Sequence, residues 1–364
     1  MNRKFVALLV LLVALAAGGP SVAAGASAGT LLGVFYGGQG WQMEQVRAME
    51  AWQGRRNAVV VLFTNWDTSL KAQRNLFEQQ LPNIWRNGNV PLLTWEPFLK
   101  GETPANIEAQ IAAGAYDAYV REWGIRLKTF LQGPDGVFGS GDDRRIYLRL
   151  AHEMNGNWYP WSAAAGQTTP TDYVAMWRRV HGLVDGLGIG PAHVQWVWSV
   201  NHTDNGPFTA EQYFPGDAWL DWIGIDGYNW GASQVWSTWA TPEATFGPMK
   251  TRLRALSAKP LAIAETASTS RTTAGSNIAQ KSAWVSSLFS WATANGAGML
   301  CWFNLDKETD WAAFGGASGD ETFKLGRTTY RGYAAYRQAV ASNNFTPSDT
   351  GNPRLLTDAQ FRGY

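Results

Sequence analysis

One short segment of the chain brings an acid, a histidine and three aromatic side chains together. Residues 149–161 read Arg-Leu-Ala-His-Glu-Met-Asn-Gly-Asn-Trp-Tyr-Pro-Trp, so that Glu153 directly follows His152. The aromatic residues of this segment are Trp158, Tyr159 and Trp161. A positioned carboxylic acid can donate a proton to a leaving group, and large aromatic rings offer flat apolar faces for stacking. This combination indicates a site that cleaves a carbohydrate.

A second glutamate, Glu265, ends the apolar segment 261–264. Enzymes that cleave glycosidic bonds use two carboxyl groups, one that protonates the leaving oxygen and one that acts at the anomeric carbon. The two groups hold different protonation states at one pH, so their surroundings must separate their pKa values. Structural ion pairs with Arg149 or Lys259 are the alternative for each glutamate alone. For two glutamates at strand ends, we favour the catalytic pair.

Both glutamates follow segments that have the composition of strands. Eight short apolar runs are rich in β-branched and aromatic residues, and several lack strict alternation, as in strands covered on both faces. These runs lie at 31–36, 58–64, 90–96, 145–152, 194–201, 221–228, 260–266 and 298–304. Segments with helical spacing separate them, at 43–52, 70–86, 105–130, 171–187, 242–256, 277–294 and 328–341, with 203–214 the weakest helical candidate.

This alternation predicts an α/β fold, a single-domain (β/α)8 TIM barrel, with a doubly wound sheet as the alternative. In such a barrel the reacting groups stand at the carboxyl ends of the strands. Glu153 would follow the fourth strand and Glu265 would end the seventh, so that their side chains converge across the barrel mouth. A carboxyl separation of ~5–5.5 Å would give retention of the anomeric configuration, and one of ~6.5–9.5 Å would give inversion.

The two ends of the chain differ from the segments between them. Residues 1–28 combine a positively charged start, an apolar run too short to span a bilayer and the small-residue pattern Ala26-Ser27-Ala28, which are features of an export signal peptide. Cleavage near 22–24 is the alternative. We therefore expect a secreted, extracellular protein whose catalytic domain covers 29–342. The polar residues 343–364 form a C-terminal tail that is either loose or packed on the barrel.

The composition limits the class of partner. The formal net charge is +1 and there is no basic run, so nothing directs the chain toward nucleic acid or acidic lipid. Its one cysteine, Cys301, excludes an intrachain disulfide. The 20 tryptophans suit an aromatic core and a carbohydrate-binding surface equally well. We expect a monomer that binds a polysaccharide, needs no cofactor and has no membrane contact after signal cleavage.

The segment 133–143 is rich in glycine and aspartate, with carboxylates at Asp135, Asp142 and Asp143. These oxygens could bind Ca²⁺, but their spacing does not match a complete calcium loop, and a turn is the favoured interpretation. A metal-dependent hydrolase is also disfavoured, because no His-x-His pair ends an early strand. We therefore predict no metal site.

In these motifs the chain resembles glycoside hydrolase family 26, a family of retaining (β/α)8 β-mannanases. The segment 149–161 carries the most specific match, and the resemblance covers about residues 31–340. Further matching segments lie at 196–201, 221–230, 259–266 and 301–304. The resemblance implies that Glu153 is the general acid/base and that Glu265 is the nucleophile that forms a covalent glycosyl-enzyme.

The resemblance also implies roles for residues around the two glutamates. His152 would hydrogen-bond the sugar in the cleavage subsite, and Trp158 would shape the subsites beside the cleaved bond. Tyr228 would hydrogen-bond and orient the nucleophile, and Trp302 would be the platform under the cleaved sugar. Packing at the top of the barrel is the alternative for these two aromatic residues. The remaining candidate substrate-binding residues are Arg149, Asn201, Trp161 and Trp230.

The implied activity is that of an endo-β-glycanase on β-1,4-linked mannan, glucomannan or galactomannan. Mixed-linkage β-1,3-1,4-glucan and β-1,3-xylan are the alternative substrates on the same barrel. The orientation of one hydroxyl separates mannose from glucose, and only hydrogen-bonding groups discriminate strongly at that level. A non-catalytic carbohydrate-binding barrel is an alternative of a different class. It predicts the loss of one glutamate, and both are present.

Overall fold

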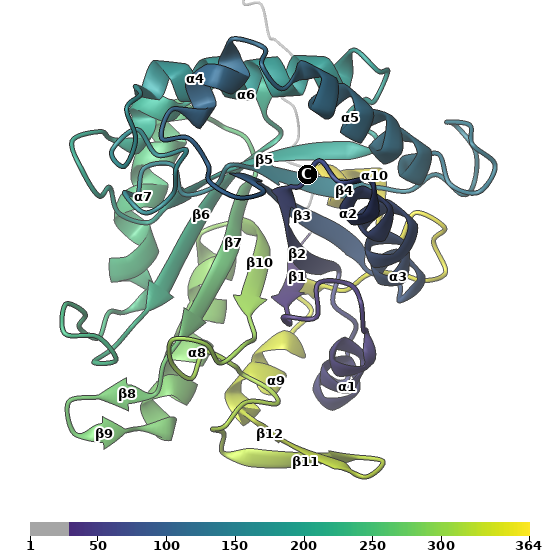
Figure 1. Cartoon of the computed structure of the whole chain (residues 1–364). Helices are drawn as coiled ribbons and strands as arrows, with labels where there is room; N and C mark the ends of the chain where they lie inside the picture. Colours follow the sequence, from purple (N-terminus) through teal and green to yellow (C-terminus); the bar gives the residue numbers. More distant parts are fainter. Residues whose placement is uncertain (1–28) are drawn as a thin grey trace, which may run out of the picture.

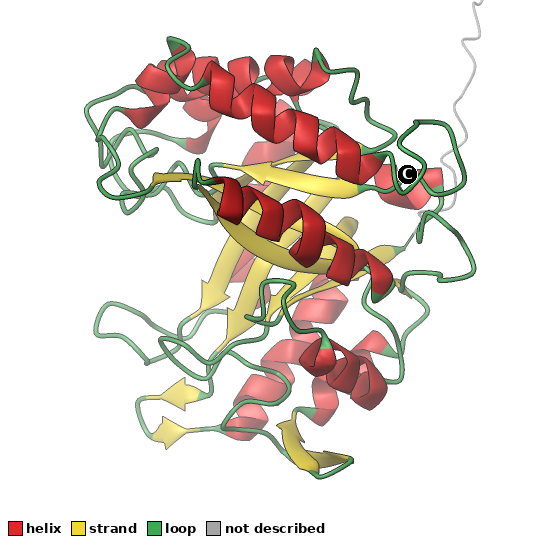
Figure 2. Cartoon of the chain, turned by 45° about the vertical axis from the view of Figure 1, so that its right-hand side comes forward, coloured by secondary structure: helices red, strands yellow, loops and turns green. Residues whose placement is uncertain are grey.

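The computed structural model describes residues 29–364, so the expected signal peptide at 1–28 lies outside the described residues. Eight parallel strands form a closed barrel, because each pairs with its neighbour and β10 (Ala297–Phe303) returns to pair with β1 (Thr30–Phe35). Figure 1 shows these strands at the centre of the molecule, and Figure 2 shows helices packed on the outside of them. The predicted (β/α)8 barrel is confirmed.

The barrel strands lie within a few residues of the predicted apolar runs. Six further barrel strands lie between β1 and β10 in the sheet. They are β2 (Val59–Trp66), β3 (Val90–Leu99), β4 (Ile146–Leu150), β5 (Val194–Asn201), β6 (Trp222–Asn229) and β7 (Leu261–Ser268). Their side chains point alternately into the barrel and toward the helices. In β10, for example, Cys301 packs inside the barrel, whereas Trp302 packs against the surrounding helices.

The helix layer follows most of the predicted segments, with two breaks in regularity. The helices are α1 (Glu44–Gln53), α2 (Leu70–Arg74), α3 (Leu81–Arg86), α4 (Ile107–Ala112), α5 (Asp117–Leu131), α6 (Pro170–Asp185), α7 (Pro242–Leu256), α8 (Ile278–Ala294), α9 (Ala334–Val340) and α10 (Asp358–Arg362). A π-helical segment, η1 (Asn75–Gln80), joins α2 to α3. The predicted helix 105–130 is divided in two at Gly114, whose φ of 93° only glycine adopts readily. Within residues 29–364, no helix is long and apolar enough to cross a membrane.

The prediction of a helix over 328–341 was wrong in its first half. Residues Thr328–Gly332 form β12, which pairs antiparallel with β11 (Glu321–Leu325), and α9 begins only at Ala334. The threonines and tyrosine of β12 favour a strand, and the partner strand β11 was not recognised. The weak helical candidate after β5 contains only a short 3-10 helix, η2 (Ala210–Tyr213).

The segment 133–143 consists of turns, as predicted. The Asp143 carboxylate lies 3.1 Å from the guanidinium of Arg354 and 3.2 Å from Nε2 of His193. Asp142 accepts a hydrogen bond from the backbone N–H of Asp135, at 3.1 Å. The Asp142 carboxylate therefore stabilises the turn from within, and the Asp143 carboxylate joins it to the segments that carry His193 and Arg354.

The C-terminal residues pack on the amino-terminal end of the barrel. A short strand, β13 (Phe345–Thr346), pairs with β1, and α10 lies beside β4 in Figure 1. Phe361 of α10 is fully buried, and its ring packs against that of Tyr147 in β4, with 4.9 Å between the ring centroids. The tail therefore closes the base of the barrel, which leaves the opposite end open.

Candidate active site

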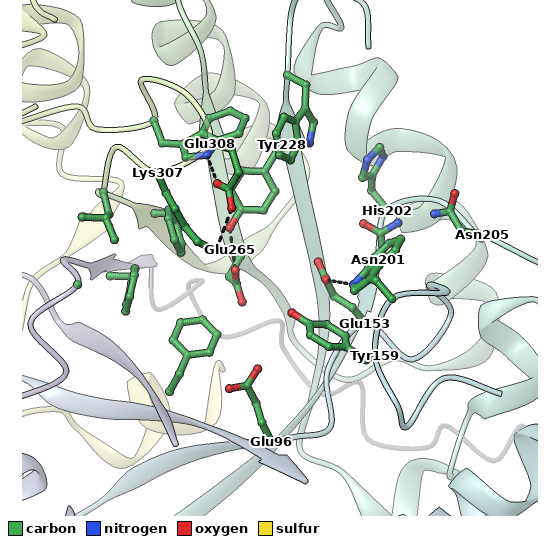
Figure 3. Close-up of a pocket in the computed structure, with 18 of the residues that line it drawn as sticks. Glu96, Glu153, Tyr159, Asn201, His202, Asn205, Tyr228, Glu265, Lys307 and Glu308 are labelled. Carbon is green, nitrogen blue, oxygen red and sulfur yellow. Dashed lines mark hydrogen bonds and ion pairs between the residues drawn. The ribbon is translucent and has the colours of Figure 1, made fainter. Parts of the chain in front are cut away.

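A cleft of about 960 Å³ is lined by residues at the carboxyl ends of the barrel strands. Glu153, which follows β4, and Glu265 of β7 both line it, and Figure 3 shows their carboxyl groups on facing sides. The tertiary structure therefore brings the two predicted glutamates into one cleft. Four more of the predicted site residues also line it, namely Trp158, Asn201, Tyr228 and Trp230.

The backbone around Glu153 has an unusual conformation. Ala151 and Glu153 have φ values of 44° and 54°, in the left-handed region that residues with side chains rarely adopt. Neighbouring elements fix this turn, because Ala151 N–H donates to the Trp95 carbonyl and Glu153 N–H donates to the Ser199 carbonyl, both at 3.0 Å. Such strained conformations persist where surrounding contacts over-determine them, and they cluster at active sites.

The Glu153 carboxyl has an environment suited to a proton donor. Its Oε2 accepts one hydrogen bond, from the indole N–H of Trp158 at 3.0 Å. Burial, followed by the negative charges of Asp226 and Glu265, raises the pKa of Glu153 well above its ordinary value. The carboxyl therefore retains its proton at pH values where an exposed glutamate has lost it.

The Glu265 carboxyl has different partners. Its Oε2 accepts a hydrogen bond from the Tyr228 hydroxyl at 2.7 Å, and its Oε1 pairs with the Arg149 guanidinium. The Nε2 atom of His152 lies 3.7 Å from the same Oε1. Charge-assisted hydrogen bonds of this kind are strong and directional, so these contacts fix the orientation of the Glu265 carboxyl group in the cleft.

Arg149 connects three barrel strands beneath the cleft. Its side chain is fully buried, and it donates to the Thr94 hydroxyl of β3 and to Oδ1 of Asp226 in β6, the latter at 2.9 Å. Asp226 also accepts a hydrogen bond from the Ser199 hydroxyl at 2.9 Å. Burial raises the pKa of Asp226 to about 7. Arg149 is therefore buried and paired, and its partners include the candidate nucleophile.

Known proteins share this architecture. A model of glycosyl hydrolase family 26 matches residues 142–253, which include the segment of Glu153. Over these residues the chain is similar to glycoside hydrolase family 26. A solved structure, the catalytic domain of a family 26 endo-β-1,4-mannanase from Bacillus sp. JAMB-750, superposes with a TM-score of 0.61 at 17% identity, over 87% of each chain. At that identity the likeness shows the fold.

Two curated relatives of the chain have different substrates in their names. Endoglucanase H of Acetivibrio thermocellus is 28% identical over 309 residues, which are 83% of this chain and 29% of the relative. Mannan endo-1,4-β-mannosidase of Bacillus subtilis is 24% identical over 159 residues, which are 41% of this chain and 42% of the relative. The chain thus spans less than half the length of either relative.

Two predicted sugar-binding residues of the family 26 motif lie behind the cleft wall. His152 is buried, and its Nε2 lies 3.3 Å from the Tyr159 hydroxyl. Burial, followed by the charge of Arg149, lowers the pKa of His152 well below its ordinary value, so the ring is neutral. Trp161 is fully buried, donates to the His152 carbonyl at 2.8 Å and stacks on Tyr159. Trp161 therefore lies behind the cleft wall and does not line the cleft, so its role in sugar binding stays a prediction.

The predicted platform residue, Trp302, is also displaced from the cleft. Only 1% of its surface is exposed, and its ring packs against those of Trp284 and Tyr336 in the helix layer. Successive side chains of a strand point to opposite faces, so the next residue, Phe303, faces the cleft instead. At the end of β10, Phe303 thus lines the cleft and Trp302 does not, and the platform role of Trp302 stays a prediction.

Some residues of the site were not recognised in the sequence. Asp226 stands inside an otherwise apolar strand, which is a signal of a paired buried charge. Glu96 lies at the end of the predicted strand 90–96, in the same position relative to its strand as the two chosen glutamates, and it lines the cleft. Lys307 and Trp311 also line the cleft from the loop after β10, and no pattern in the sequence marks them.

Proposed function

We propose that this chain is a secreted, endo-acting β-glycanase that hydrolyses a polysaccharide with retention of configuration. The observation that carries the proposal is the contrast between two carboxyl groups in one cleft. Among residues 29–364, Glu265 accepts from a guanidinium and a phenol hydroxyl, whereas the Glu153 carboxyl accepts only from an indole N–H and has a raised pKa. Double displacement needs this pair of an anion and a protonated acid.

In the first step, a carboxylate oxygen of Glu265 attacks the anomeric carbon and the bond to the leaving oxygen breaks. Glu153 donates its proton to that oxygen, so the shortened chain leaves as a neutral alcohol. The Tyr228 and Arg149 contacts fix the Glu265 side chain for this attack. In the second step, Glu153 removes a proton from water, which attacks the same carbon and releases Glu265.

The shape of the cleft supports action within a polysaccharide chain. It is lined by residues in or directly after the eight barrel strands, and Trp158 at its rim is 46% exposed. Trp236, in the loop after β6, also lines the cleft and is 67% exposed. Exposed indoles at an open cleft can stack on successive sugar rings of a long chain, which suits endo cleavage.

The sugar has two candidates. The resemblance in the sequence favours β-1,4-mannan, glucomannan or galactomannan, and the mannosidase relative agrees with it. A β-glucan is the second candidate, because the relative named endoglucanase aligns with twice the share of this chain. The proposed mechanism is the same for both, since the two carboxyl groups act at the anomeric carbon and not at the hydroxyl that distinguishes the sugars.

A panel of polysaccharides tests the activity and the substrate together. The purified chain should release oligosaccharides of several lengths from galactomannan, glucomannan, barley β-glucan or β-1,3-xylan. NMR of the first product formed should show the β anomer. Absence of cleavage on every member of the panel would contradict the enzyme proposal, and an initial α anomer would contradict retention.

Replacement of each glutamate tests the two roles. Both Glu153→Ala and Glu265→Ala should reduce kcat on polysaccharide by at least about 10⁴-fold, because each removes one half of the displacement. Azide should restore cleavage of an activated aryl glycoside in both variants. With Glu153→Ala the product should be the β-glycosyl azide, because the glycosyl-enzyme still forms. With Glu265→Ala it should be the α-azide, and exchanged stereochemistry would reverse the assignment.

A further inference from the structure

A third glutamate, Glu96 of β3, lines the cleft together with the proposed catalytic pair. Figure 3 shows its carboxyl group directed into the cleft, opposite Glu265. Within residues 29–364, no group donates a hydrogen bond to this carboxyl and no cation forms an ion pair with it. Partly buried carboxylates ordinarily have such partners, so the unpaired oxygens of Glu96 are available to a ligand.

The charges around Glu96 come from both walls of the cleft. Burial, followed by the negative charge of Glu265, raises the pKa of Glu96 to about 7, whereas the positive charges of Arg149 and Lys307 oppose that rise. A second carboxyl beside the nucleophile costs free energy in the free protein. A sugar that donates hydroxyl hydrogen bonds to Glu96 would offset this cost.

The position of Glu153 decides which side of the cleaved bond Glu96 faces. Because Glu153 protonates the leaving oxygen, the leaving part of the chain must extend along the wall of Glu153, Trp158 and Asn205. The part that becomes attached to Glu265, the glycone, must extend along the opposite wall. That wall is formed by residues of β1, β2, β3 and β10, and Glu96 belongs to it.

An apolar surface accompanies Glu96 on the glycone side. The rings of Phe35, Phe63 and Phe303 all line the cleft, with centroids 5.0 Å apart for the first two and 4.7 Å apart for Phe35 and Phe303. A pyranose ring has an apolar C–H face and a rim of hydroxyl groups. The three aromatic rings can pack against the C–H face of the sugar, and the charged ends of Glu96 and Lys307 can hydrogen-bond its hydroxyl groups.

We propose that Glu96 binds neighbouring hydroxyl groups of the glycone and thereby contributes to the choice of sugar. The inference rests on the proposed function, because it needs the glycone to lie along this wall. The two carboxylate oxygens accept from two adjacent hydroxyls, as a bidentate contact. Sites that hydrogen-bond a hydroxyl discriminate strongly against a sugar that presents it differently, so Glu96 acts on substrate binding and not on proton transfer.

Binding can be measured without cleavage in chains that carry Glu153→Gln. Titration calorimetry with manno- and gluco-oligosaccharides should show that adding Glu96→Ala weakens binding of the preferred sugar by about 10- to 100-fold, as expected for hydrogen bonds to a charged group. Glu96→Gln keeps the shape of the side chain and should weaken binding by a smaller factor. The matched control is Glu102→Gln, which removes the same charge from the loop after β3 but is exposed and does not line the cleft.

Kinetics separate this role from an effect through Glu265. In the chain with both catalytic glutamates, Glu96→Gln should raise KM on oligosaccharides more than it lowers kcat, and the pH profile of kcat should stay in place. Unchanged affinity in both Glu96 variants would overturn the inference, as would a loss confined to kcat. Failure of the proposed function would look different, because the unsubstituted chain would then cleave no polysaccharide.

Discussion

Two buried arginines, Arg145 directly before β4 and Arg149 within it, have different roles at the two ends of the barrel. Arg145, near the closed base, donates to the Leu356 carbonyl at 3.0 Å and pairs with Asp358 of the C-terminal tail. Arg149, four residues later at the open mouth, pairs with Asp226 and with the proposed nucleophile Glu265. Their side chains are both almost fully buried.

The partners make the difference between the two arginines. Asp358 is two-thirds exposed, so water stabilises it whether or not Arg145 is present. Asp226 and Glu265 are buried, so the removal of Arg149 would leave two carboxylates without a cation. A buried charge without its partner is costly. Two equally buried arginines therefore differ in role. Arg145 holds the C-terminal tail on the base of the barrel, whereas Arg149 holds the carboxylates of the cleft at its mouth.

Among the changes that test this comparison of the two arginines, the largest effect is expected from Arg149→Lys. Lysine keeps the charge, but its compact ammonium cannot reach Thr94, Asp226 and Glu265 at once as the planar guanidinium does. We expect kcat to fall by about 10²- to 10³-fold, the range for loss of one positioned electrostatic group. Steady-state kinetics on the preferred polysaccharide measure this. Arg145→Lys is the matched control, and an equal loss of kcat in the two variants would break the comparison.

A smaller effect, on stability alone, is expected from Arg145→Met. The change leaves the Leu356 carbonyl without its donor and loosens the tail, which should lower the free energy of unfolding by about 1–3 kcal/mol. Urea unfolding measures this, and limited proteolysis should cut more readily after residue 342. The kcat of the folded protein should stay within about twofold, given that distant sites are energetically independent. A large loss of kcat would show that the base and the mouth are coupled.

The smallest effect is a shift in pH dependence in Trp158→Phe. The indole N–H stabilises the ionised form of Glu153 and so lowers its pKa. Its removal should raise that pKa further, and because the acid must be protonated to act, the basic limb of kcat/KM should move to higher pH by about one unit. Trp236→Phe is the control, since Trp236 lines the same cleft and no hydrogen bond joins it to Glu153 among the described residues. A limb that moves to lower pH would contradict the assignment of Glu153 as the acid.

The sequence by itself determined the barrel and the two glutamates. Strand and helix periods are local properties of neighbouring residues, and the eight apolar runs alternated with helical segments clearly enough to predict the closed sheet. The positions of Glu153 and Glu265 then followed, because side chains at the carboxyl ends of parallel strands meet at one mouth. The helical pattern of 328–341 gave a wrong prediction for the first half of that segment. Strand β12 forms there because it pairs with β11, and a local pattern does not reveal such a partner.

Only the tertiary structure decided which neighbours those residues have. The direction of Trp302 depends on the exact register of β10, and a change of one residue exchanges the cleft face for the helix face. The left-handed turn at Glu153 depends on hydrogen bonds that its backbone N–H groups donate to carbonyls of β3 and β5. The contacts of Arg149 with Asp226 and Glu265 join strands β4, β6 and β7, which are far apart in sequence. Such contacts leave no local period, and for that reason the electrostatic difference between the two glutamates could not be seen in the sequence.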